Sequence, residues 1–319
     1  MDSLNLIEKA IGREQFGRNP QSLYEPIRYI MALGGKRLRP MLVLLAYRMY
    51  RDDFRKVMPQ AIAVEAFHNF TLMHDDIMDQ APLRRGKPTV HKKWNVNTAI
   101  LSGDVMLVKV YDMLSKLDAE LLKQSLPLFN QTAREVCEGQ QLDMDFETRA
   151  TVTEKEYLNM IRLKTAVLLG FSLQFGALLA GAPAEEQRLL HEFGTGIGVG
   201  FQLKDDLLDV YADKDKFGKQ VGGDIISNKK TFLLIKALER ATGKDKKELT
   251  GWLAATRFHK AEKVKAVTAL YDRLDIAALT RKKIEGCFKK SFSLLDQLGK
   301  TRDVSGVIRY AGVLMDRQH

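Results

Sequence analysis

The segment AIAVEAFHNFTLMHDDIMD, residues 61–79, places three aspartates at the end of a long apolar stretch. Its apolar residues recur at three- and four-residue spacing, which is the period of an α-helix with a buried face. On such a helix Asp75 and Asp79 lie one turn apart on the same face, and Asp76 lies about 100° round from Asp75. We therefore expect a buried helix that ends in a stripe of carboxylates.

A second segment, GIGVGFQLKDDLLD at residues 196–209, repeats the arrangement with Asp205, Asp206 and Asp209. Like charges one turn apart destabilise a helix, and burying them costs far more unless cations intervene. Oxygen ligands without paired His or Cys favour Mg²⁺, which binds through carboxylates together with substrate phosphates. One such cluster is compatible with a solvated helix face, whereas two in matching apolar contexts favour metal binding.

Helical periodicity extends along nearly the whole chain, and no run of alternating β-branched residues predicts a sheet. Pro59 suits a first helical turn, and Thr153 with Glu156 has the spacing of a capping box. The glycines at 194, 196, 198 and 200 do not form a GxGxxG loop and are expected to let helices approach closely. The expected helices span about 4–16, 20–33, 37–50, 59–80, 95–117, 120–142, 154–180, 185–211, 228–241, 245–256, 260–275, 278–298 and 303–317.

Two polar, glycine-rich connections interrupt these helices, at residues 81–93 and 212–227. Since no flexible linker and no repeat of solenoid period divides the chain, we expect one all-α domain over residues 1–319. The N-terminus MDSLNLIEKA shows no secretion signal. The most apolar window, residues 167–182, falls short of the roughly 20 residues of a membrane span. A cytoplasmic enzyme with no transmembrane segment is therefore expected.

The chain of 319 residues has a formal net charge of +10, which indicates an anionic partner such as nucleic acid, a membrane surface or a phosphorylated substrate. Residues 241–319 carry 17 Lys and Arg against 9 Asp and Glu, with the spacing of solvated helix faces. The two cysteines, Cys137 and Cys287, are too few for a disulfide framework and are expected to be reduced and buried. Composition alone does not choose among the anions.

Cations at fixed places identify the anion better than the net charge does. GGKRLRP at residues 34–40 puts three cations at a helix start, where the helix dipole disfavours them. Arg84 and Arg85 follow the first acidic segment, and Lys219 and Lys229 follow the second. Lys and Arg donors near helix N-termini bind phosphate. Metal ligands and phosphate ligands thus alternate twice along the chain, which is the layout of a diphosphate site.

With these motifs in this order, the chain resembles the trans-type isoprenyl diphosphate synthases, the family of farnesyl and geranylgeranyl diphosphate synthases. Both DDxxD segments together with the basic motifs between them are a specific signal. Further matching segments are LSGDVML at 101–107, GQQLD at 139–143, KTAVL at 164–168 and GKQVGGD…KKT at 218–231. Leu233 stands where the family often has proline, so that helix is expected to start slightly differently. RQH at 317–319 offers only Arg317 for a basic tail, which leaves C-terminal closure open.

The resemblance implies an all-α fold around a deep central cavity, with the two acidic clusters facing each other at its mouth. It implies Mg²⁺ ions held by Asp75, Asp79 and Asp205 and supported by Asp76, Asp143, Asp206, Asp209 and Asp224. It implies that the allylic diphosphate contacts Arg84, Lys164, Thr165, Gln202 and Lys219, which with Asp75, Asp76, Asp79 and Asp205 form the catalytic set. It places isopentenyl diphosphate against Lys36, Arg39, His68 and Arg85 with Phe201 beside them, and puts Gln140 and Lys229 around the metal and diphosphate.

The reaction implied is the condensation of isopentenyl diphosphate with dimethylallyl, geranyl or farnesyl diphosphate by a homodimer. Ionisation of the allylic C–O bond creates a carbocation and a diphosphate leaving group, whose charge Mg²⁺, Arg and Lys stabilise. An apolar cavity excludes the water that would quench the cation. The isopentenyl double bond then attacks, and by the family's mechanism the departing diphosphate takes the proton.

Product length depends in this family on the residues four, five and eight positions before the first aspartate, which are Thr71, Phe70 and Phe67 here. Two aromatic rings argue against a long polyprenyl product. The small Thr71 leaves room where farnesyl enzymes often carry a second aromatic residue. We therefore expect geranylgeranyl diphosphate, with farnesyl diphosphate as the alternative.

Other functional classes explain fewer of these residues. A di-iron bundle needs two Glu-x-x-His motifs, and only Glu65 with His68 has that spacing. A helical phosphohydrolase leaves the second acidic segment unexplained, and a terpene cyclase usually has one DDxxD and a different second metal motif. A catalytically silent partner subunit is expected to lose motif residues, and none is lost. No recognisable nucleic-acid-binding module is present.

Overall fold

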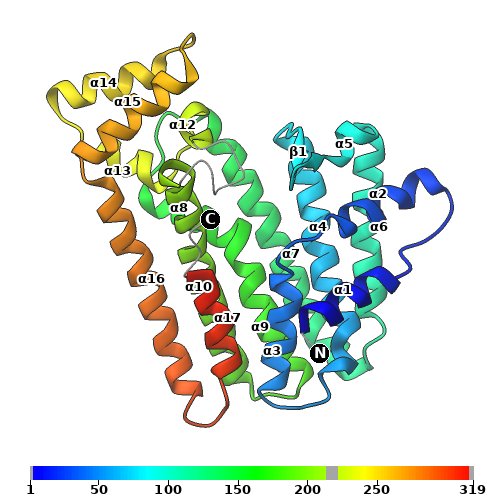
Figure 1. Ribbon diagram of the computed structural model, residues 1–319. Coiled ribbons are helices and arrows are strands. Elements are labelled where there is room, and N and C mark those ends of the chain that lie inside the picture. Colours follow the sequence, from blue (N-terminus) through cyan, green and yellow to red (C-terminus); the bar gives the residue numbers. More distant parts are fainter. Residues whose placement is uncertain (1–2, 213–221, 316–319) are drawn as a thin grey trace. The chain divides into compact units, whose positions relative to one another are not determined.

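The computed structural model describes residues 3–212 and 222–315, and the regular structure in them is almost entirely helical (Figure 1). The predicted all-α class is confirmed. The chain divides into two compact units, Met1–Gln131 with Phe171–His191, and Thr132–Gly170 with Glu192–His319. A single domain over the whole chain stays a prediction.

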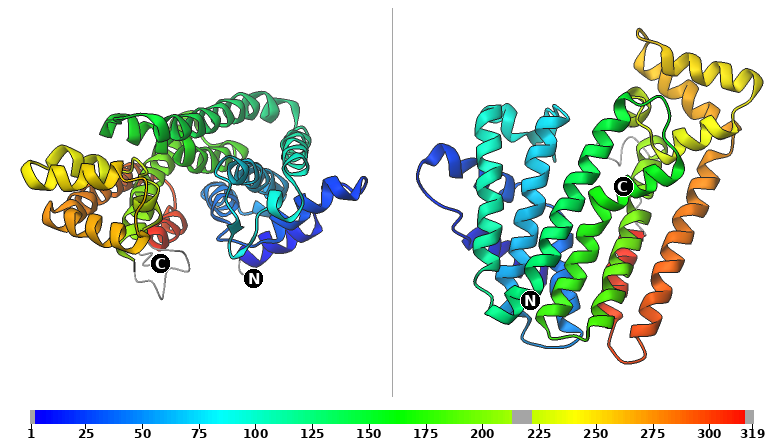
Figure 2. Two further views of the ribbon diagram at one scale, coloured as in Figure 1. Left: turned by 90° about the horizontal axis from the view of Figure 1, so that it is seen from above. Right: turned by 180° about the vertical axis from the view of Figure 1, so that it is seen from behind.

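The first unit is built around α4 (Met58–Met78), against which α1, α2, α3, α5 and α6 pack. Figure 2 shows α4 and α6 (Val96–Leu114) side by side. A Cβ atom at Gly103 of α6 would lie 2.2 Å from Nε2 of His74, so the glycine permits this close packing. The remaining elements of this unit are α1 (Ser3–Arg13), α2 (Gln21–Ala32), α3 (Leu38–Arg48), η1 (Phe54–Val57), β1 (Leu83–Arg84), β2 (Lys87–Pro88) and α5 (Val90–Lys93).

The second unit contains α8 (Glu154–Ile161), η2 (Arg162–Ala166), α12 (Gly223–Ile226), α13 (Phe232–Arg240), α14 (Gly243–Ala254), α15 (Lys260–Arg273), α16 (Ile276–Leu298) and α17 (Ser305–Met315). Helices α7 (Ala119–Thr148), α9 (Val167–Leu179) and α10 (Ala184–Tyr211) have residues in both units. A Cβ atom at Gly194 would lie 2.8 Å from the Cα atom of Gly170, and one at Gly198 would lie 2.7 Å from the Cα atom of Ala166. The spaced glycines therefore do let α10 approach its neighbour closely.

Local signals place most helix ends within a few residues of the prediction. Pro59 lies in the first turn of α4. The capping box of α8 is present, since Thr153 and Glu156 each bond the other's backbone N–H. Such a box satisfies two N–H groups that have no partner within the helix.

Three details differ from the prediction. The expected helix 154–180 is interrupted by η2, a five-residue π-helical segment. The expected helix 228–241 begins only at Phe232, after the separate short helix α12. The expected burial of the cysteines is wrong, because Cys137 is exposed and Cys287 is half-buried, although both are free.

The segment Glu154–Leu179 is long and apolar enough to cross a membrane by composition. However, 78% of its most apolar window is buried inside the chain, as in the core helix of a soluble protein. This agrees with the predicted buried helix in this region.

Candidate active site

The first acidic segment lies at the C-terminal end of α4, where Asp75 and Asp76 are in the last turn and Asp79 caps the helix. The Asp79 N–H donates to the Asp75 carbonyl at 2.8 Å, so these two residues lie one turn apart as predicted. Asp76 is only 2% exposed, whereas Asp75 is half-buried and Asp79 is exposed. The partial negative charge of a helix C-terminus disfavours carboxylates, so a bound cation would relieve this arrangement.

Asp76 is held by Arg84 from the neighbouring hairpin. Nη2 of Arg84 lies 2.7 Å from Oδ1 of Asp76, and its Nε–H donates at 2.8 and 2.9 Å to the two carboxylate oxygens. The hairpin turns through Arg85 and Gly86, both with positive φ (53° and 74°), which is the backbone of a tight two-residue turn. Burial raises the pKa of Asp76, and Arg84 opposes that rise. The buried aspartate therefore positions an arginine beside the acidic stripe.

The second acidic segment repeats this pattern near the C-terminal end of α10. Asp206 is 5% exposed, whereas Asp205 and Asp209 are half-buried. Oδ2 of Asp209 accepts a hydrogen bond from the Asp224 N–H at 3.0 Å, which ties α12 to α10. In both segments the second aspartate is thus enclosed while the first and fifth remain accessible.

Asp206 is enclosed by polar partners. The Tyr157 hydroxyl donates a hydrogen bond to Asp206, and the Gln202 amide donates to its Oδ1 at 3.1 Å. The Thr165 hydroxyl in turn donates to Oε1 of Gln202 at 3.4 Å. Burial raises the pKa of Asp206 to about 8, with a further contribution from Asp224. Thr165, Gln202 and Asp206 thus form one hydrogen-bonded chain, whereas the contact of Thr165 and Gln202 with the allylic diphosphate stays a prediction.

Lys164 lies in the π-helical segment η2, and such segments occur frequently at functional sites. Its Nζ lies 2.6 Å from Oδ2 of Asp143, and Nζ of Lys229 lies 3.8 Å from the same oxygen. Burial raises the pKa of Asp143, but Lys229 and Lys164 outweigh it, so the pKa is lowered overall. Two of the expected diphosphate ligands are thus gathered around one carboxylate.

Gly139, in the GQQLD motif, brings α7 against this segment. A Cβ atom built on it would lie 2.2 Å from the backbone N of Lys164, closer than real atoms approach. Because the obstructing atoms belong to backbone, a side chain here forces the two segments apart.

We expect Gly139→Ala to lower the free energy of unfolding by about 1–3 kcal/mol through this clash. The matched control is Gly286→Ala in α16, where a Cβ atom meets nothing within 4 Å. That change is expected to stabilise the protein by up to about 1 kcal/mol, because alanine is the better helix former. Urea denaturation of both variants measures the difference, and equal midpoints would contradict the close approach.

A basic cluster occupies the start of α3 and the middle of α4 in the first unit. Nη1 of Arg85 donates to the Gly34 carbonyl. Burial lowers the pKa of Arg39 to about 10, and burial together with Arg39 and Arg85 holds the pKa of His68 well below its usual value. Nε of Arg39 is buried without a hydrogen-bond partner in the described part of the chain, while Lys36 is exposed. A buried N–H without an acceptor among cations suits an anion.

The three residues expected to limit product length differ in their surroundings. Phe67 is 1% exposed and packs edge-on against Phe129, with ring centroids 5.1 Å apart. Phe70 is half-buried and contacts His74 at a centroid distance of 4.8 Å. Thr71 is half-buried, and its hydroxyl donates to the backbone carbonyl one turn before it. Phe70 and Thr71 are thus more accessible than Phe67.

Comparison with known proteins agrees with this assembly of motifs. The chain matches the family described as polyprenyl synthetase over residues 20–271. The chain belongs to the polyprenyl synthetase family. The geranylgeranyl diphosphate synthase of Methanosarcina mazei is 46% identical over 228 residues, covering 71% of this chain and 70% of that relative. The farnesyl diphosphate synthase of Bacillus subtilis is 38% identical over 234 residues, covering 70% and 79%.

Solved structures of polyprenyl synthetases share the all-α fold. A crystal structure of a geranylgeranyl pyrophosphate synthase matches with a TM-score of 0.92 and 43% identity, covering 100% of both chains. The predicted resemblance is therefore confirmed. This polyprenyl synthetase is a prenyltransferase of the trans-type isoprenyl diphosphate synthases.

The donor set of this polyprenyl synthetase fits Mg²⁺ in the chemistry of its ligands. Within residues 3–212 and 222–315, no three His, Cys, Asp or Glu side chains come together as a complete metal-binding group. Mg²⁺ is usually held by one or two carboxylates and completed by substrate phosphates and water. The residues predicted to hold Mg²⁺, Asp75, Asp79 and Asp205, offer carboxylates of this kind.

Some expected site residues are not brought together by these contacts. Asp75 and Asp79 belong to the first unit and Asp205 to the second, so the facing arrangement of the clusters stays a prediction. Phe201 also belongs to the second unit. The other residues expected to bind isopentenyl diphosphate, which are Lys36, Arg39, His68 and Arg85, belong to the first. Lys219 and Arg317 lie outside the described residues.

Two partners of the site were not found from the sequence of this polyprenyl synthetase. Tyr157 donates to Asp206 from 49 positions away, and no local pattern marks it. Arg37 is 2% exposed and lies between two expected ligands, Lys36 and Arg39. The signal that could have found Arg37 is its position at a helix start, where a cation is otherwise unfavourable.

Proposed function

We propose that this polyprenyl synthetase condenses isopentenyl diphosphate with dimethylallyl, geranyl and farnesyl diphosphate and releases geranylgeranyl diphosphate. The observation that carries the proposal is the matched burial in the two DDxxD segments. Each encloses its second aspartate and leaves the first and fifth accessible. Relatives that bear the names geranylgeranyl and farnesyl diphosphate synthase support the substrate class.

In this proposal Asp75, Asp79 and Asp205 hold Mg²⁺, which when bound neutralises charge on the diphosphate leaving group. Arg84, oriented by Asp76, donates hydrogen bonds to the same diphosphate. Lys164, Lys219, Gln202 and Thr165 bind it from the other acidic segment, while Asp143, Asp206, Asp209, Asp224, Gln140 and Lys229 hold these groups in place. Donors aimed at developing charge in this way lower the barrier to ionisation of the C–O bond.

The basic cluster is proposed to bind isopentenyl diphosphate. Lys36, Arg39 and Arg85 supply charge, and the neutral His68 supplies a hydrogen bond without adding to the repulsion among them. Phe201 would lie beside the bound substrate. No side chain is needed as the base, because the departing diphosphate takes the proton.

Geranylgeranyl diphosphate is proposed over farnesyl diphosphate because Thr71 is small. The ring of Phe70, which is half-buried, is proposed to limit further elongation. The same assay distinguishes the two products.

The deciding experiment incubates the purified protein with Mg²⁺, isopentenyl diphosphate and each allylic diphosphate in turn. The products are hydrolysed and sized by chromatography. We expect elongation to the geranylgeranyl length. Failure to elongate any primer would overturn the proposal, and products that stop at farnesyl would support the alternative product.

The enzyme is further proposed to act in the cytoplasm as a homodimer that pairs through α6. Of the nine large apolar side chains exposed in the part of the chain that the structure describes, five lie on this helix. They are Val96, Ile100, Leu101, Val108 and Tyr111. An apolar face of this kind marks an interaction site, and a second copy offers the same face.

The double substitution Leu101→Glu with Val108→Glu is expected to convert the dimer to a monomer, because both side chains are 57% exposed on α6. Sedimentation velocity measures the change. Ile308→Glu, which alters an exposed apolar residue of α17, is the control and is expected to leave the dimer intact. A double variant that remains dimeric would exclude this face as the interface.

A further inference from the structure

Arg37 occupies an unusual backbone position at the start of α3. It is the N-cap residue and has left-handed angles (φ 45°, ψ 41°), which residues with a side chain rarely adopt. Gly34 and Gly35 before it also have positive φ, 75° and 139°. Strained backbone of this kind persists where the surroundings hold it in place, and it gathers at functional sites.

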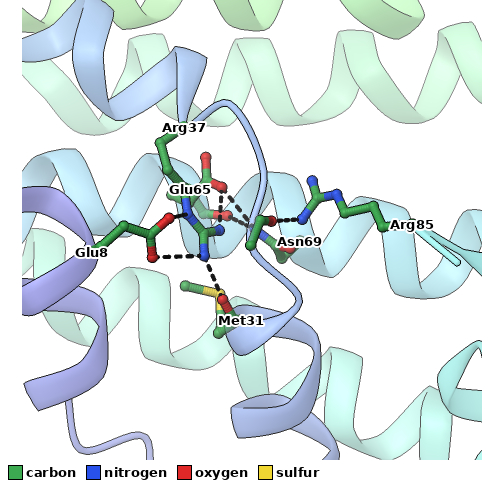
Figure 3. Close-up of polar contacts among 7 residues, drawn as sticks. Glu8, Met31, Arg37, Glu65, Asn69 and Arg85 are labelled. Carbon is green, nitrogen blue, oxygen red and sulfur yellow. Dashed lines mark hydrogen bonds and ion pairs between the residues drawn. The ribbon is translucent and has the colours of Figure 1, made fainter. Parts of the chain in front are cut away.

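The surroundings that hold Arg37 are drawn in Figure 3. Nε of Arg37 lies 2.8 Å from Oε1 of Glu8, and its Nη1 lies 2.9 Å from Oε1 of Glu65. Its Nη2 donates to the Met31 carbonyl at 2.6 Å. The Asn69 amide donates to the Glu65 carbonyl at 2.8 Å and to the Glu65 carboxylate at 3.3 Å. One guanidinium therefore joins α1, α2 and α4 to the segment that precedes α3.

Glu65 also stabilises the positive charges of the neighbouring arginines. It is 2% exposed, and its charge favours the charged forms of both Arg39 and Arg85 as well as that of Arg37. Three guanidinium groups gathered without a carboxylate would repel one another and be costly to desolvate. Removing one partner of a buried ion pair strongly destabilises a protein, because the other charge is left buried and unpaired. Glu65 and Arg37 therefore depend on each other.

We propose that the Arg37–Glu65 ion pair, completed by Glu8 of the N-terminal helix, positions the isopentenyl diphosphate pocket. Its role is to hold the segment 34–40 so that Lys36 and Arg39 grip the substrate diphosphate. Arg85, bonded to the Gly34 carbonyl, is anchored to the same segment. The inference rests on the proposed function, and it assigns a role to a residue outside the matched range 20–271.

The test compares Glu8→Gln and Glu65→Gln with the wild type in steady-state kinetics. The KM for isopentenyl diphosphate is expected to rise about 10-fold for Glu8→Gln and about 10²-fold for Glu65→Gln, since small misplacements of binding groups have effects of this size. The KM for the allylic diphosphate is expected to stay within about twofold, because Arg84 is held by Asp76 and Gln202 bonds Asp206, neither of which belongs to this network. Arg37→Lys keeps the positive charge but loses the planar guanidinium that donates to several partners at once. Its KM for isopentenyl diphosphate is therefore expected to rise above that of the wild type.

Glu14→Gln, which removes a carboxylate just beyond the end of α1, is the matched control and is expected to leave both KM values unchanged. Glu8 is the decisive position, because its side chain is 41% exposed, so Glu8→Gln is expected to remain folded even if Glu65→Gln unfolds. A rise in both KM values together, or a lower melting temperature with no change in either, would overturn the proposal.

A binding measurement separates this inference from the proposed function. Isopentenyl diphosphate alone, without metal or primer, is titrated into each protein by calorimetry, because none of the proposed Mg²⁺ ligands, Asp75, Asp79 and Asp205, belongs to the basic cluster. Weaker binding by Glu8→Gln than by the wild type supports the inference, and equal binding overturns it. A wild type that binds isopentenyl diphosphate but elongates no primer would overturn the proposed function instead.

Discussion

Asp75→Ala and Asp205→Ala are each expected to lower kcat by at least about 10²-fold, since they remove groups that stabilise charge developing on the leaving diphosphate. Neither variant is expected to unfold. Both side chains are half-buried, and Asp75 lies in the last turn of α4, where a carboxylate is unfavourable without a cation. Single-turnover assays with saturating primer measure the chemical step, and thermal melting measures stability.

Two comparisons make this result specific. Asp112→Ala removes an exposed aspartate of α6 whose ion pair is with Lys109, and it is expected to keep wild-type kcat. Asp206→Ala is expected to lose about 1–3 kcal/mol of stability as well, because it leaves the Tyr157 hydroxyl buried without its acceptor. Wild-type turnover in both Asp75→Ala and Asp205→Ala would show that these segments do not act in the reaction.

The helices and the acidic segments could be predicted from the sequence because their signals are local. A helix repeats every 3.6 residues, so one apolar face and its aspartates can be placed by counting. Caps act over three or four residues, which is why Thr153 with Glu156 and Pro59 marked helix starts. The order of the acidic and basic motifs indicated the protein family, which helical periodicity alone does not identify.

The contacts that organise the site could not be predicted from the sequence, because they join residues far apart in the chain. Glu8 and Glu65 meet at Arg37 from 29 and 28 positions away, and nothing near any of them indicates the others. The π-helical segment around Lys164 depends on the absence of a side chain at Gly139, 25 positions earlier. Local patterns therefore locate the ligands, whereas long-range packing decides how they are held.

The buried second aspartates show how these two levels combine. Counting along the helix predicts only that Asp76 and Asp206 lie to one side of the stripe. In the structure, Asp76 binds Arg84 and Asp206 accepts hydrogen bonds from Tyr157 and Gln202. Each is therefore engaged and enclosed within the protein, whereas the outer aspartates of its segment are more accessible.

Phe70→Ala is expected to shift the product beyond geranylgeranyl diphosphate by one or more isoprene units. Its ring is half-buried, so its removal makes room for a longer product without leaving a large cavity in the hydrophobic core. Phe67→Ala is expected to lengthen the product as well, but to cost about 3–5 kcal/mol of stability, because its ring is 1% exposed and packs against Phe129. Reversed-phase chromatography of the hydrolysed products and urea denaturation measure the two effects.

The two substitutions separate a limit on chain length from general loosening of the core. Phe16→Ala removes another buried ring of the first unit, 2% exposed just after α1, and is expected to lower stability without changing the product. If loosening alone lengthened the product, Phe16→Ala and Phe67→Ala would do so and the milder Phe70→Ala would not. A longer product from Phe70→Ala at nearly wild-type stability would therefore identify its ring as the limit, and an unchanged product in both α4 variants would exclude these aromatic residues from that role.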